Sequence, residues 1–248
     1  NRKKNGIKLT KEGKILHGIA LKIEKCVANA EKELLKIMNK NVTFVFGASF
    51  IIGNYILPRF LNNLKENIHN DVSINVSVSH EAIQDLLDKK IDIALVENYI
   101  PNEEIIYREW MEDEIVIFSN QKLPLKAKAE DLLSYKWVCR NPESNTRLLF
   151  KENLEKANYP DCDTFNVTSE VTSATTIVQT VLHSDKNLTP TVSIVSRNAI
   201  ESLLKAGALY ESRIGNQKML RKLYIAYRKD KKHDAFIENV VDYLLKMK

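Results

Sequence analysis

Two groups of residues stand where apolar runs of the sequence give way to helical periodicity. The first group follows the apolar run 42–46 and consists of Ser49, Phe50 and Ile51. The second group consists of Ser144, Asn145 and Thr146. Hydroxyls and the free N–H groups of a first helical turn attract anions, by about 0.3–1 kcal/mol for each exposed helix end. If both helix starts face one space, they form a site for a carboxylate, a sulfate or a phosphate.

Two charged residues end predicted strands and complete this site. Glu97 follows the apolar run 91–96, and Arg140 closes the run 136–140. A guanidinium at that place would balance the charge of a bound anion. The alternative interpretations are ordinary ones: solvated surface positions for Glu97 and Arg140, and simple helix caps for Ser49 and Ser144.

Enzymatic chemistry finds little support in the sequence. The five His residues have no metal-ligand spacing, and none accompanies a nucleophile in a motif. Cys26, Cys139 and Cys162 are an odd number and also lack metal-ligand spacing. They suit free structural thiols in a reducing cytoplasm, and redox sensing is the alternative. We therefore expect no enzymatic activity, no metal and no cofactor.

The elements that must position the predicted site alternate between strands and helices. Apolar runs and two-residue alternation predict strands at 42–46, 72–78, 91–96, 115–118, 136–140, 165–168, 192–195 and 223–227. Helical spacing of apolar residues predicts helices at 54–67, 82–87, 146–157, 174–182, 200–204 and 236–245. The β-α-β-α-β order indicates parallel strands joined by right-handed crossovers, and hence an α/β fold. The polar segment 120–126 is interpreted as a crossing to a second lobe.

A longer helix precedes this α/β body, with Thr10 as its candidate N-cap and periodicity to about residue 39. Apolar residues recur along it at alternating spacings of 4 and 3, as in paired helices: Leu16, Ala20, Ile23, Val27, Ala30, Leu34 and Ile37. A helix of roughly 45 Å buries such a stripe only against a helix of similar length. We therefore predict a dimerisation helix, and the alternative is packing onto the protein's own body.

Positive charge is concentrated in the same N-terminal part. The net charge is +5, from 37 Lys and Arg against 32 Asp and Glu. Residues 1–40 contain 11 of these basic residues and 4 of the acidic ones. This asymmetry suggests an N-terminal part that faces a polyanion, and a solvated Lys-rich helix is the alternative. The sequence has no apolar run of about 18 residues and no secretion signal at its start, so we expect a cytoplasmic protein without membrane contact.

Several stretches resemble the LysR-type transcriptional regulators. The segment 47–58, Gly-Ala-Ser-Phe-Ile-Ile-Gly-Asn-Tyr-Ile-Leu-Pro, is similar to the opening of that family's effector domain and is the most specific match. The segment 5–13 is similar to the family's G-x-x-L-T-x-x-G wing and linker start. The segments 87–96, 143–147 and 193–196 resemble later parts of the effector domain. The resemblance covers essentially the whole chain.

The resemblance implies a periplasmic-binding-protein-like effector domain of two α/β lobes, joined by two crossing strands and preceded by the linker helix. It divides the chain into a wing remnant and linker helix (1–40), lobe I (41–118 and 220–248) and lobe II (119–219). It also implies homodimers or homotetramers that bind promoter DNA through a winged helix-turn-helix. Most of that DNA-binding domain is absent from this sequence.

The family's arrangement of lobes would add Thr191 and Val192 to the rim of the ligand site. Two departures from the family pattern concern the same region. Asn145 stands where the family usually has Gly, and Thr189-Pro190-Thr191 replaces a Gly-containing turn. Both changes make the surroundings bulkier or stiffer, so we expect a smaller ligand or a different mode of recognition.

The combined prediction is a transcriptional regulator whose effector domain binds a small anionic metabolite between its lobes. Ligand binding would change the lobe angle and signal through the linker helices to the DNA-binding heads. The alternative from another class is a periplasmic-type solute-binding protein for a small anion. The heptad-patterned helix and the missing signal peptide argue against that alternative.

Overall fold

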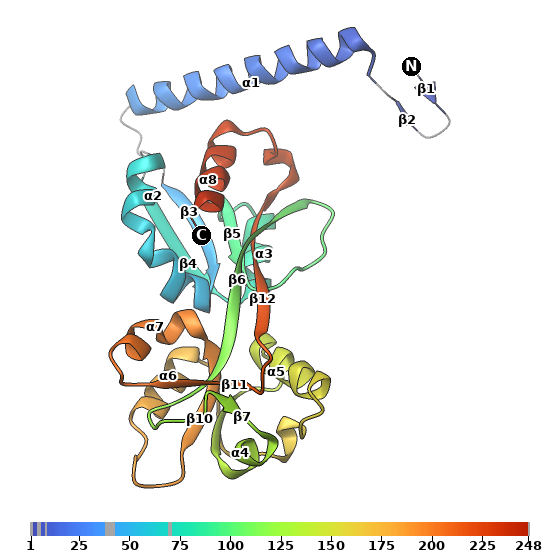
Figure 1. Ribbon diagram of the computed structural model, residues 1–248. Helices are drawn as coiled ribbons and strands as arrows, with labels where there is room; N and C mark the ends of the chain where they lie inside the picture. Colours follow the sequence, from blue (N-terminus) through green and yellow to red (C-terminus); the bar gives the residue numbers. More distant parts are fainter. Residues whose placement is uncertain (1, 4–5, 8, 38–42, 69–70, 248) are drawn as a thin grey trace.

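The computed structural model describes residues 2–3, 6–7, 9–37, 43–68 and 71–247. Two α/β lobes follow one another along the long axis of the body, and a long helix, α1, lies across one end (Figure 1). One sheet of ten strands passes through both lobes in the order β4-β3-β5-β12-β6-β10-β8-β9, with β11 and β7 attached through β6. The expected α/β fold with two lobes and a preceding helix is confirmed.

Lobe I is built around three parallel strands, β3 (Phe44–Ser49), β4 (Val72–Ser77) and β5 (Ile93–Val96). Its helices are α2 (Leu61–Ile68), α3 (Ser79–Leu87) and α8 (Ala235–Lys246). Phe44 and Phe46 of β3 and all four residues of β5 are buried, and β4 is the edge strand. The carboxyl ends of β3 and β5 therefore lie side by side.

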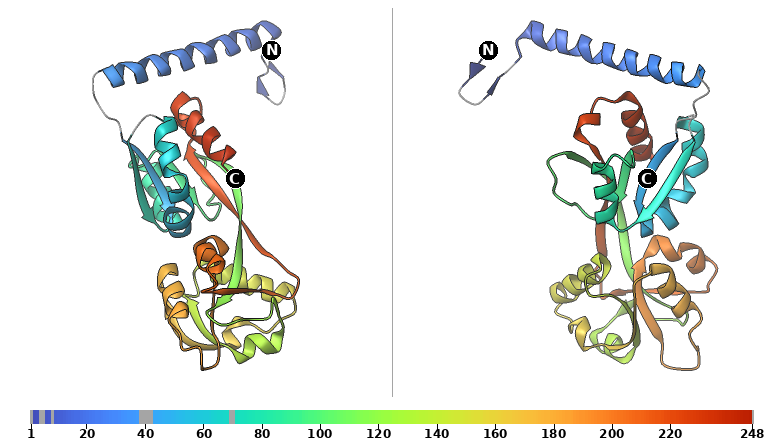
Figure 2. Two further views of the ribbon diagram at one scale, coloured as in Figure 1. Left: turned by 60° about the vertical axis from the view of Figure 1, so that its left-hand side comes forward. Right: turned by 180° about the vertical axis from the view of Figure 1, so that it is seen from behind.

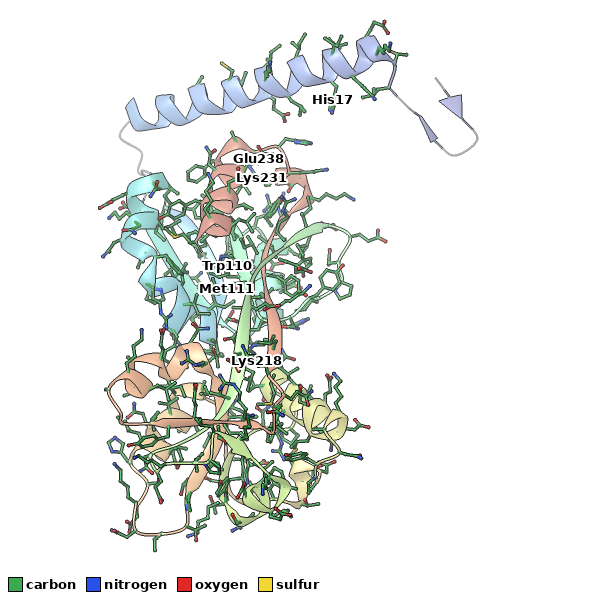
Figure 3. The ribbon with its side chains drawn as sticks, in the orientation of Figure 1. His17, Trp110, Met111, Lys218, Lys231 and Glu238 are labelled. Atoms are coloured by element: carbon green, nitrogen blue, oxygen red, sulfur yellow. The ribbon has the colours of Figure 1, made fainter. Side chains whose placement is uncertain are left out.

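Two long antiparallel strands, β6 (Ile105–Ser119) and β12 (Met219–Arg228), connect the lobes. Over its later part β6 pairs with β10 and β11 of lobe II. Trp110 lies in lobe I, whereas Lys218, just before β12, lies near lobe II (Figure 3). The crossing thus occurs inside β6. The prediction that segment 120–126 forms the crossing is wrong, because this segment joins β6 to β7 within lobe II.

Lobe II contains β7 (Lys126–Ala127), β8 (Lys136–Arg140), β9 (Asn166–Val171), β10 (Thr191–Ser196) and β11 (Tyr210–Ile214). Its helices are α4 (Ala129–Ser134), α5 (Asn145–Lys156), α6 (Ala174–Leu182) and α7 (Arg197–Lys205). Strand β8 lies between β9 and β10 and runs parallel to both. Consequently α5, which follows β8, begins at the lobe I side of lobe II (Figure 1).

The segment 54–67 is not the continuous helix that its periodicity predicts. A π-helix (Ile52–Ile56) and a 3₁₀ turn (Leu57–Arg59) precede α2. Pro58 lacks an N–H and its ring excludes the preceding turn from regular α-helix. Gly53 also packs tightly, because a Cβ there would lie 2.7 Å from Val76.

Helix α1 (Lys11–Ile37) begins at its predicted cap, since Thr10 Oγ1 accepts the N–H of Gly13 at 3.0 Å. Two short paired strands, β1 (Arg2–Lys3) and β2 (Gly6–Ile7), precede it. The helix passes over α8 of lobe I and extends beyond it (Figures 1 and 2). Among the described helices, none combines the length and apolar character that crossing a bilayer demands.

The predicted dimerisation stripe of α1 points into solvent where its side chains are described. Leu16, Ile23 and Val27 are 68%, 59% and 52% exposed, and Ala20 and Ala30 are exposed too. The side chains of Leu34 and Ile37 lie outside the described part of the chain. The body therefore does not cover the described part of this stripe.

Candidate functional site

Two predicted site residues, Glu97 and Thr146, both contact Arg221 of β12, a residue absent from the predicted site. Arg221 Nη1 binds Glu97 Oε2, at the end of β5, at 2.5 Å. The same nitrogen lies 3.5 Å from Thr146 Oγ1, in the first turn of α5. A single guanidinium thus contacts lobe I and lobe II. We call Ile51, Glu97, Asp113, Arg140, Thr146 and Arg221 the interlobe cluster.

Asp113 of β6 anchors Arg221 from the opposite side. Its carboxylate is fully buried and accepts hydrogen bonds from Arg221 Nε at 2.8 Å and from Asn198 Nδ2 at 2.9 Å. Ser196 Oγ donates to the same carboxylate. Burial by itself would lower the pKa of Arg221, but Glu97 and Asp113 outweigh it and raise that pKa. Arg221 therefore stays cationic at the junction of the lobes.

Ser49, at the end of β3 and two residues before Ile51 of the cluster, has a buried hydroxyl. Ser49 is 2% exposed, and its buried Oγ has no hydrogen-bond partner among the described residues. The N–H of Ile51 points to Glu97 Oε1 at 3.4 Å, and Ile51 itself is buried. Phe50 is 41% exposed. Ser49 is thus no ordinary helix cap, since a capping hydroxyl would accept an N–H.

Arg140 provides a guanidinium without a counter-ion in direct contact. Its Nε is buried and has no hydrogen-bond partner, and none of the ion pairs between described residues includes Arg140. Burial lowers the pKa of Arg140, the charge of Glu97 opposes that effect, and the charge of Arg221 adds to it. The charges of Glu97 and Arg221 thus act on Arg140 electrostatically. A buried polar group left unpaired is costly, and a bound anion would relieve that cost.

The start of α5 combines a cap with free amides. Ser144 Oγ accepts the N–H of Arg147 at 3.1 Å, so Ser144 is an ordinary N-cap. Asn145 is exposed, and Thr146 is 8% exposed. The N–H groups of Asn145 and Thr146 belong to the first turn, which has no intrahelical acceptor for them.

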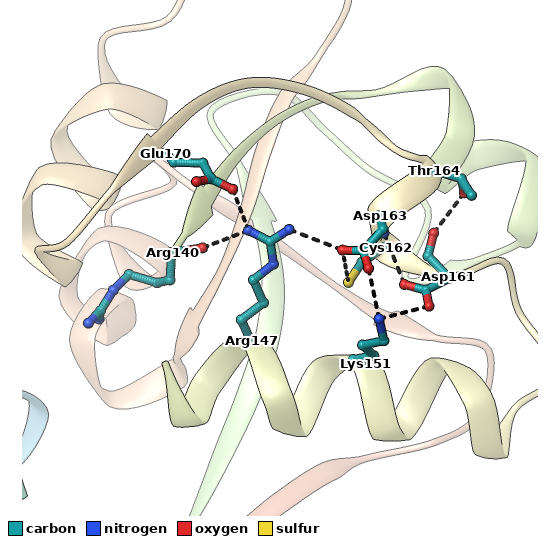
Figure 4. A network of polar contacts seen from close by, with 8 residues as sticks. All are labelled: Arg140, Arg147, Lys151, Asp161, Cys162, Asp163, Thr164 and Glu170. Atoms are coloured by element: carbon teal, nitrogen blue, oxygen red, sulfur yellow. Dashed lines mark hydrogen bonds and ion pairs between the residues drawn. The ribbon is translucent and has the colours of Figure 1, made fainter. Parts of the chain in front are cut away.

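Arg147 holds the backbone from which Arg140 projects. Arg147 Nη1 donates to the carbonyl oxygen of Arg140 at 2.9 Å and to Glu170 Oε1 at 2.7 Å (Figure 4). Its Nη2 pairs with Asp163 Oδ1 at 3.3 Å. Figure 4 shows the Arg140 side chain pointing away from this network. Arg147 therefore fixes the main chain at Arg140 while leaving the guanidinium of Arg140 available.

The structure does not bring Thr191 and Val192 to the cluster. Both lie at the beginning of β10, opposite Lys136 and Trp137 of the parallel strand β8. Arg140 lies at the other end of β8, so Thr191 and Val192 are at the far end of lobe II. Val192 is fully buried in the lobe II core, and the Thr191 carbonyl accepts the hydroxyl of Ser119. The predicted rim was assigned to the wrong end of the strand.

Asp113 and Arg221 are the residues that sequence reasoning missed. Both lie within strands, yet the apolar runs that predicted those strands begin only at residues 115 and 223. An acid and a base two residues before an apolar run are compatible with many surface strands. A pairing of β6 with β12 was needed to place them opposite one another, as the register Asp113–Arg221 does.

A separate groove of about 720 Å³ lies on the α7 side of the crossing strands. Its lining includes Arg59, Phe60, Trp110, Met111 and Asn198, and no residue of the predicted site. Arg59 spans it from lobe I to lobe II, donating to the carbonyl oxygen of Asn198 at 2.9 Å and pairing with Glu201 at 2.9 Å. These contacts tie the lobes together on that side.

The thiols do not form a reactive centre. Cys139 and Cys162 are buried free thiols, and Cys26 is exposed. Burial raises the pKa of Cys139 to about 11 and also raises the pKa of Cys162. A thiol that keeps its proton is a poor nucleophile, which disfavours redox sensing. Asp161, Cys162 and Asp163 approach within 4.8 Å of one another, but Lys151 already binds both carboxylates.

Comparisons with known proteins agree with this architecture. The uncharacterized HTH-type transcriptional regulator YeiE of Escherichia coli (strain K12) is 28% identical over 200 residues, which are 79% of this chain and 65% of that protein. The chain therefore spans about two thirds of that relative's length. The regulatory domain of CcmR from Synechocystis PCC6803, solved in complex with 2-PG, has a TM-score of 0.67 at 17% identity. That likeness covers 83% of this chain and 96% of the CcmR domain.

The N-terminal helix is included in a further structural match. The LysR family transcriptional regulator CbnR has a TM-score of 0.67 at 15% identity, covering 98% of this chain and 83% of CbnR. At these identities the structural likeness establishes the fold alone. The family model of the LysR substrate binding domain matches residues 41–248, which contain both lobes and the whole interlobe cluster. The chain therefore belongs to the LysR substrate-binding domain family.

Proposed function

We propose that the chain is the linker helix and effector domain of a LysR-type transcriptional regulator, and that it binds a small anionic metabolite at the interlobe cluster. The family membership and the names of the relatives, which are transcriptional regulators, support the regulatory role. A ligand named for one neighbouring domain, 2-PG on CcmR, provides a first candidate probe.

One observation carries the anionic preference. Within the part of the chain that the structure describes, the Arg140 guanidinium and the buried Ser49 hydroxyl have no hydrogen-bond partner. The Ser49 side belongs to lobe I and Arg140 belongs to lobe II. An anion between them would satisfy both groups at once, as well as the free amides at the start of α5. A neutral apolar ligand would leave all of these groups unpaired.

The same geometry suggests how a signal could arise. An anion held by Ser49 and Arg140 adds contacts between lobes that two strands, β6 and β12, already connect. Such a ligand favours the lobe angle at which both contacts can form. It shifts the equilibrium between that conformation and others in proportion to its difference in binding free energy for them. Helix α1 contacts α8 of lobe I, so a change in the orientation of lobe I would alter the position of α1 relative to a second copy.

The exposed stripe of α1 is proposed to pair with the same stripe of a second protomer, giving a dimer or a tetramer. Leu16, Ile23 and Val27 would lose their exposure to water in that pairing. DNA binding is proposed for a helix-turn-helix domain that would precede α1. Such an assembly would place two DNA-binding heads at a fixed separation on a promoter.

Isothermal titration calorimetry on the whole chain tests the effector proposal. The panel contains sulfate, inorganic phosphate and 2-PG, with glucose and putrescine as neutral and cationic comparisons, all at constant ionic strength. The expected result is saturable binding of at least one anion and none of glucose or putrescine. Binding of glucose or putrescine alone, or of no compound in the panel, would contradict an anion site at the interlobe cluster.

A further inference from the structure

The carboxylate of Glu97 already lies within the interlobe cluster, where the proposed effector would bind. Its Oε1 faces the N–H of Ile51 at 3.4 Å, and its Oε2 binds Arg221 Nη1. An amide N–H and a guanidinium are the donors that a foreign carboxylate would take. The Glu97 side chain is only 11% exposed, so it is enclosed at the junction of the lobes rather than extended into water.

Arg221 does not need Glu97 as its sole counter-ion. Asp113 Oδ2 accepts a hydrogen bond from Arg221 Nε at 2.8 Å and lies 2.7 Å from Nη2 as an ion-pair partner, although Nη2 makes no hydrogen bond among the described residues. Glu97 contacts Nη1 alone. Asp113 is in turn fixed by Ser196 and Asn198 of lobe II. Release of Glu97 would therefore leave Arg221 paired inside the protein. Of the two carboxylates, Glu97 is the one that can exchange.

The charges of the interlobe cluster balance before any ligand arrives. Arg140 and Arg221 carry two positive charges, and Glu97 and Asp113 carry two negative charges. An added anion would bring a third negative charge beside Glu97. Two carboxylates that compete for one guanidinium repel each other, so one of them has to move.

We propose that Glu97 is a resident anion that an anionic effector must displace from Ile51 and Arg221, so that Glu97 sets both the affinity and the selectivity of the site. This inference rests on the proposed effector site. An anion that contacts only Ile51 and Arg221 would bind too weakly to displace Glu97, whereas an anion that also binds Arg140 and Ser49 would displace it. The displaced carboxylate belongs to the segment after β5, so effector binding would rearrange lobe I locally.

Sulfate titrations of the wild type, Glu97→Gln and Glu103→Gln test the proposal. Glu103 is exposed in the segment between β5 and β6, so its substitution changes the net charge equally without touching the cluster. Glu97→Gln is expected to bind sulfate about tenfold more tightly, a factor corresponding to one charge-assisted hydrogen bond. Glu103→Gln is expected to stay within about twofold of the wild type. Thermal unfolding of each variant establishes that it is folded.

A second variant keeps the test decisive if Glu97→Gln does not fold. Glu97→Asp preserves the charge but is one methylene shorter, so it cannot hold Ile51 and Arg221 together. A gain of about threefold in sulfate affinity is expected from the loss of one contact. If the wild type binds sulfate and neither Glu97 variant binds it more tightly, the proposal that an effector displaces Glu97 is wrong, while the proposed effector site is still supported. If no variant binds sulfate, phosphate or 2-PG, both proposals fall.

Discussion

Arg147 and Arg140 are joined through the main chain: Nη1 of Arg147 donates to the carbonyl oxygen of Arg140 at 2.9 Å. Arg147 is 8% exposed; burial alone would lower its pKa, but the hydrogen bond to Glu170 and the nearby thiols outweigh burial and raise that pKa. The guanidinium of Arg147 is thus fully engaged in structural contacts, whereas the guanidinium of Arg140 has no partner among the described residues. This division explains how lobe II can present an unpaired positive charge at a fixed place.

Replacement of Arg147 should weaken both the fold and the site. Arg147→Met removes the bonds to Arg140, Glu170 and Asp163, and we expect the free energy of unfolding to fall by about 1–3 kcal/mol. Sulfate affinity should fall severalfold as the Arg140 backbone loosens. Urea denaturation and calorimetry measure the two effects. Lys151→Met is the control, because Lys151 is 46% exposed and water screens its ion pairs, so its loss should destabilise the fold less. Equal losses for both variants would argue against a special role for Arg147.

The sequence predicted most elements of the fold because their burial follows simple periodicities. Strand β8 has the predicted bounds, and α6 fills the predicted range. The crossing was misplaced because its central residues are charged, and charged side chains such as Asp113 weaken the apolar pattern on which the prediction rests. Segment 54–67 failed for a local reason, since Pro58 and the tight packing of Gly53 replace α-helix by other turns.

The candidate site was predicted in outline, but its centre was not. Helix starts and strand ends are visible in a sequence, and Glu97 and Thr146 both contact Arg221 as a result. Arg221 and Asp113 come from strands far apart in sequence, and their meeting depends on strand register. Thr191 was predicted at the rim on the basis of the family resemblance, which identifies strand β10 but not which of its ends faces lobe I. The sheet topology decides this, and it places Thr191 at the end of β10 that faces away from lobe I.

Asp113 should be the most sensitive position for stability in the interlobe cluster. Asp113→Asn leaves Arg221 buried with less compensation, and we expect a loss of about 3–5 kcal/mol in the free energy of unfolding. Glu109→Gln is the control, since Glu109 is 64% exposed and pairs with Lys222 at the surface. Denaturant titration of both variants gives the comparison. A loss below about 1 kcal/mol for Asp113→Asn would show that Arg221 finds another partner.

The exposed stripe of α1 should control assembly. Ile23→Lys combined with Val27→Lys places charges in a paired-helix seam, and we expect dissociation to monomers in sedimentation velocity runs. Gly18→Lys adds a charge on the opposite face, where nothing lies within 4 Å of an added Cβ, and should leave assembly unchanged. A monomeric wild type would refute the pairing of α1, and so would an unaltered dimer in the double variant.

Cys139 should resist modification while the protein is folded. Its pKa of about 11 keeps the thiol protonated at pH 8, so iodoacetamide should label exposed Cys26 far faster, as peptide mass spectrometry can measure. The folded state retains this proton to higher pH than an unfolded thiol, whose pKa is near 9.0. The contribution of Cys139 to stability is therefore present below pH 9.0 and declines as the pH rises toward 11. Equal labelling of both cysteines at pH 8 would contradict the buried state.

Arg140, whose guanidinium has no partner among the described residues, is the group that the proposed anion would bind between the lobes. Sulfate affinity measured by calorimetry for Arg140→Met and Arg108→Met tests this role most directly, because Arg108 is an exposed arginine of β6 and the charge change is the same. We predict that Arg140→Met lowers the affinity at least about tenfold without lowering the melting temperature, since Arg140 has no partner to lose. Arg108→Met should match the wild type. Equal sulfate affinity in the wild type and Arg140→Met would show that Arg140 does not bind the anion.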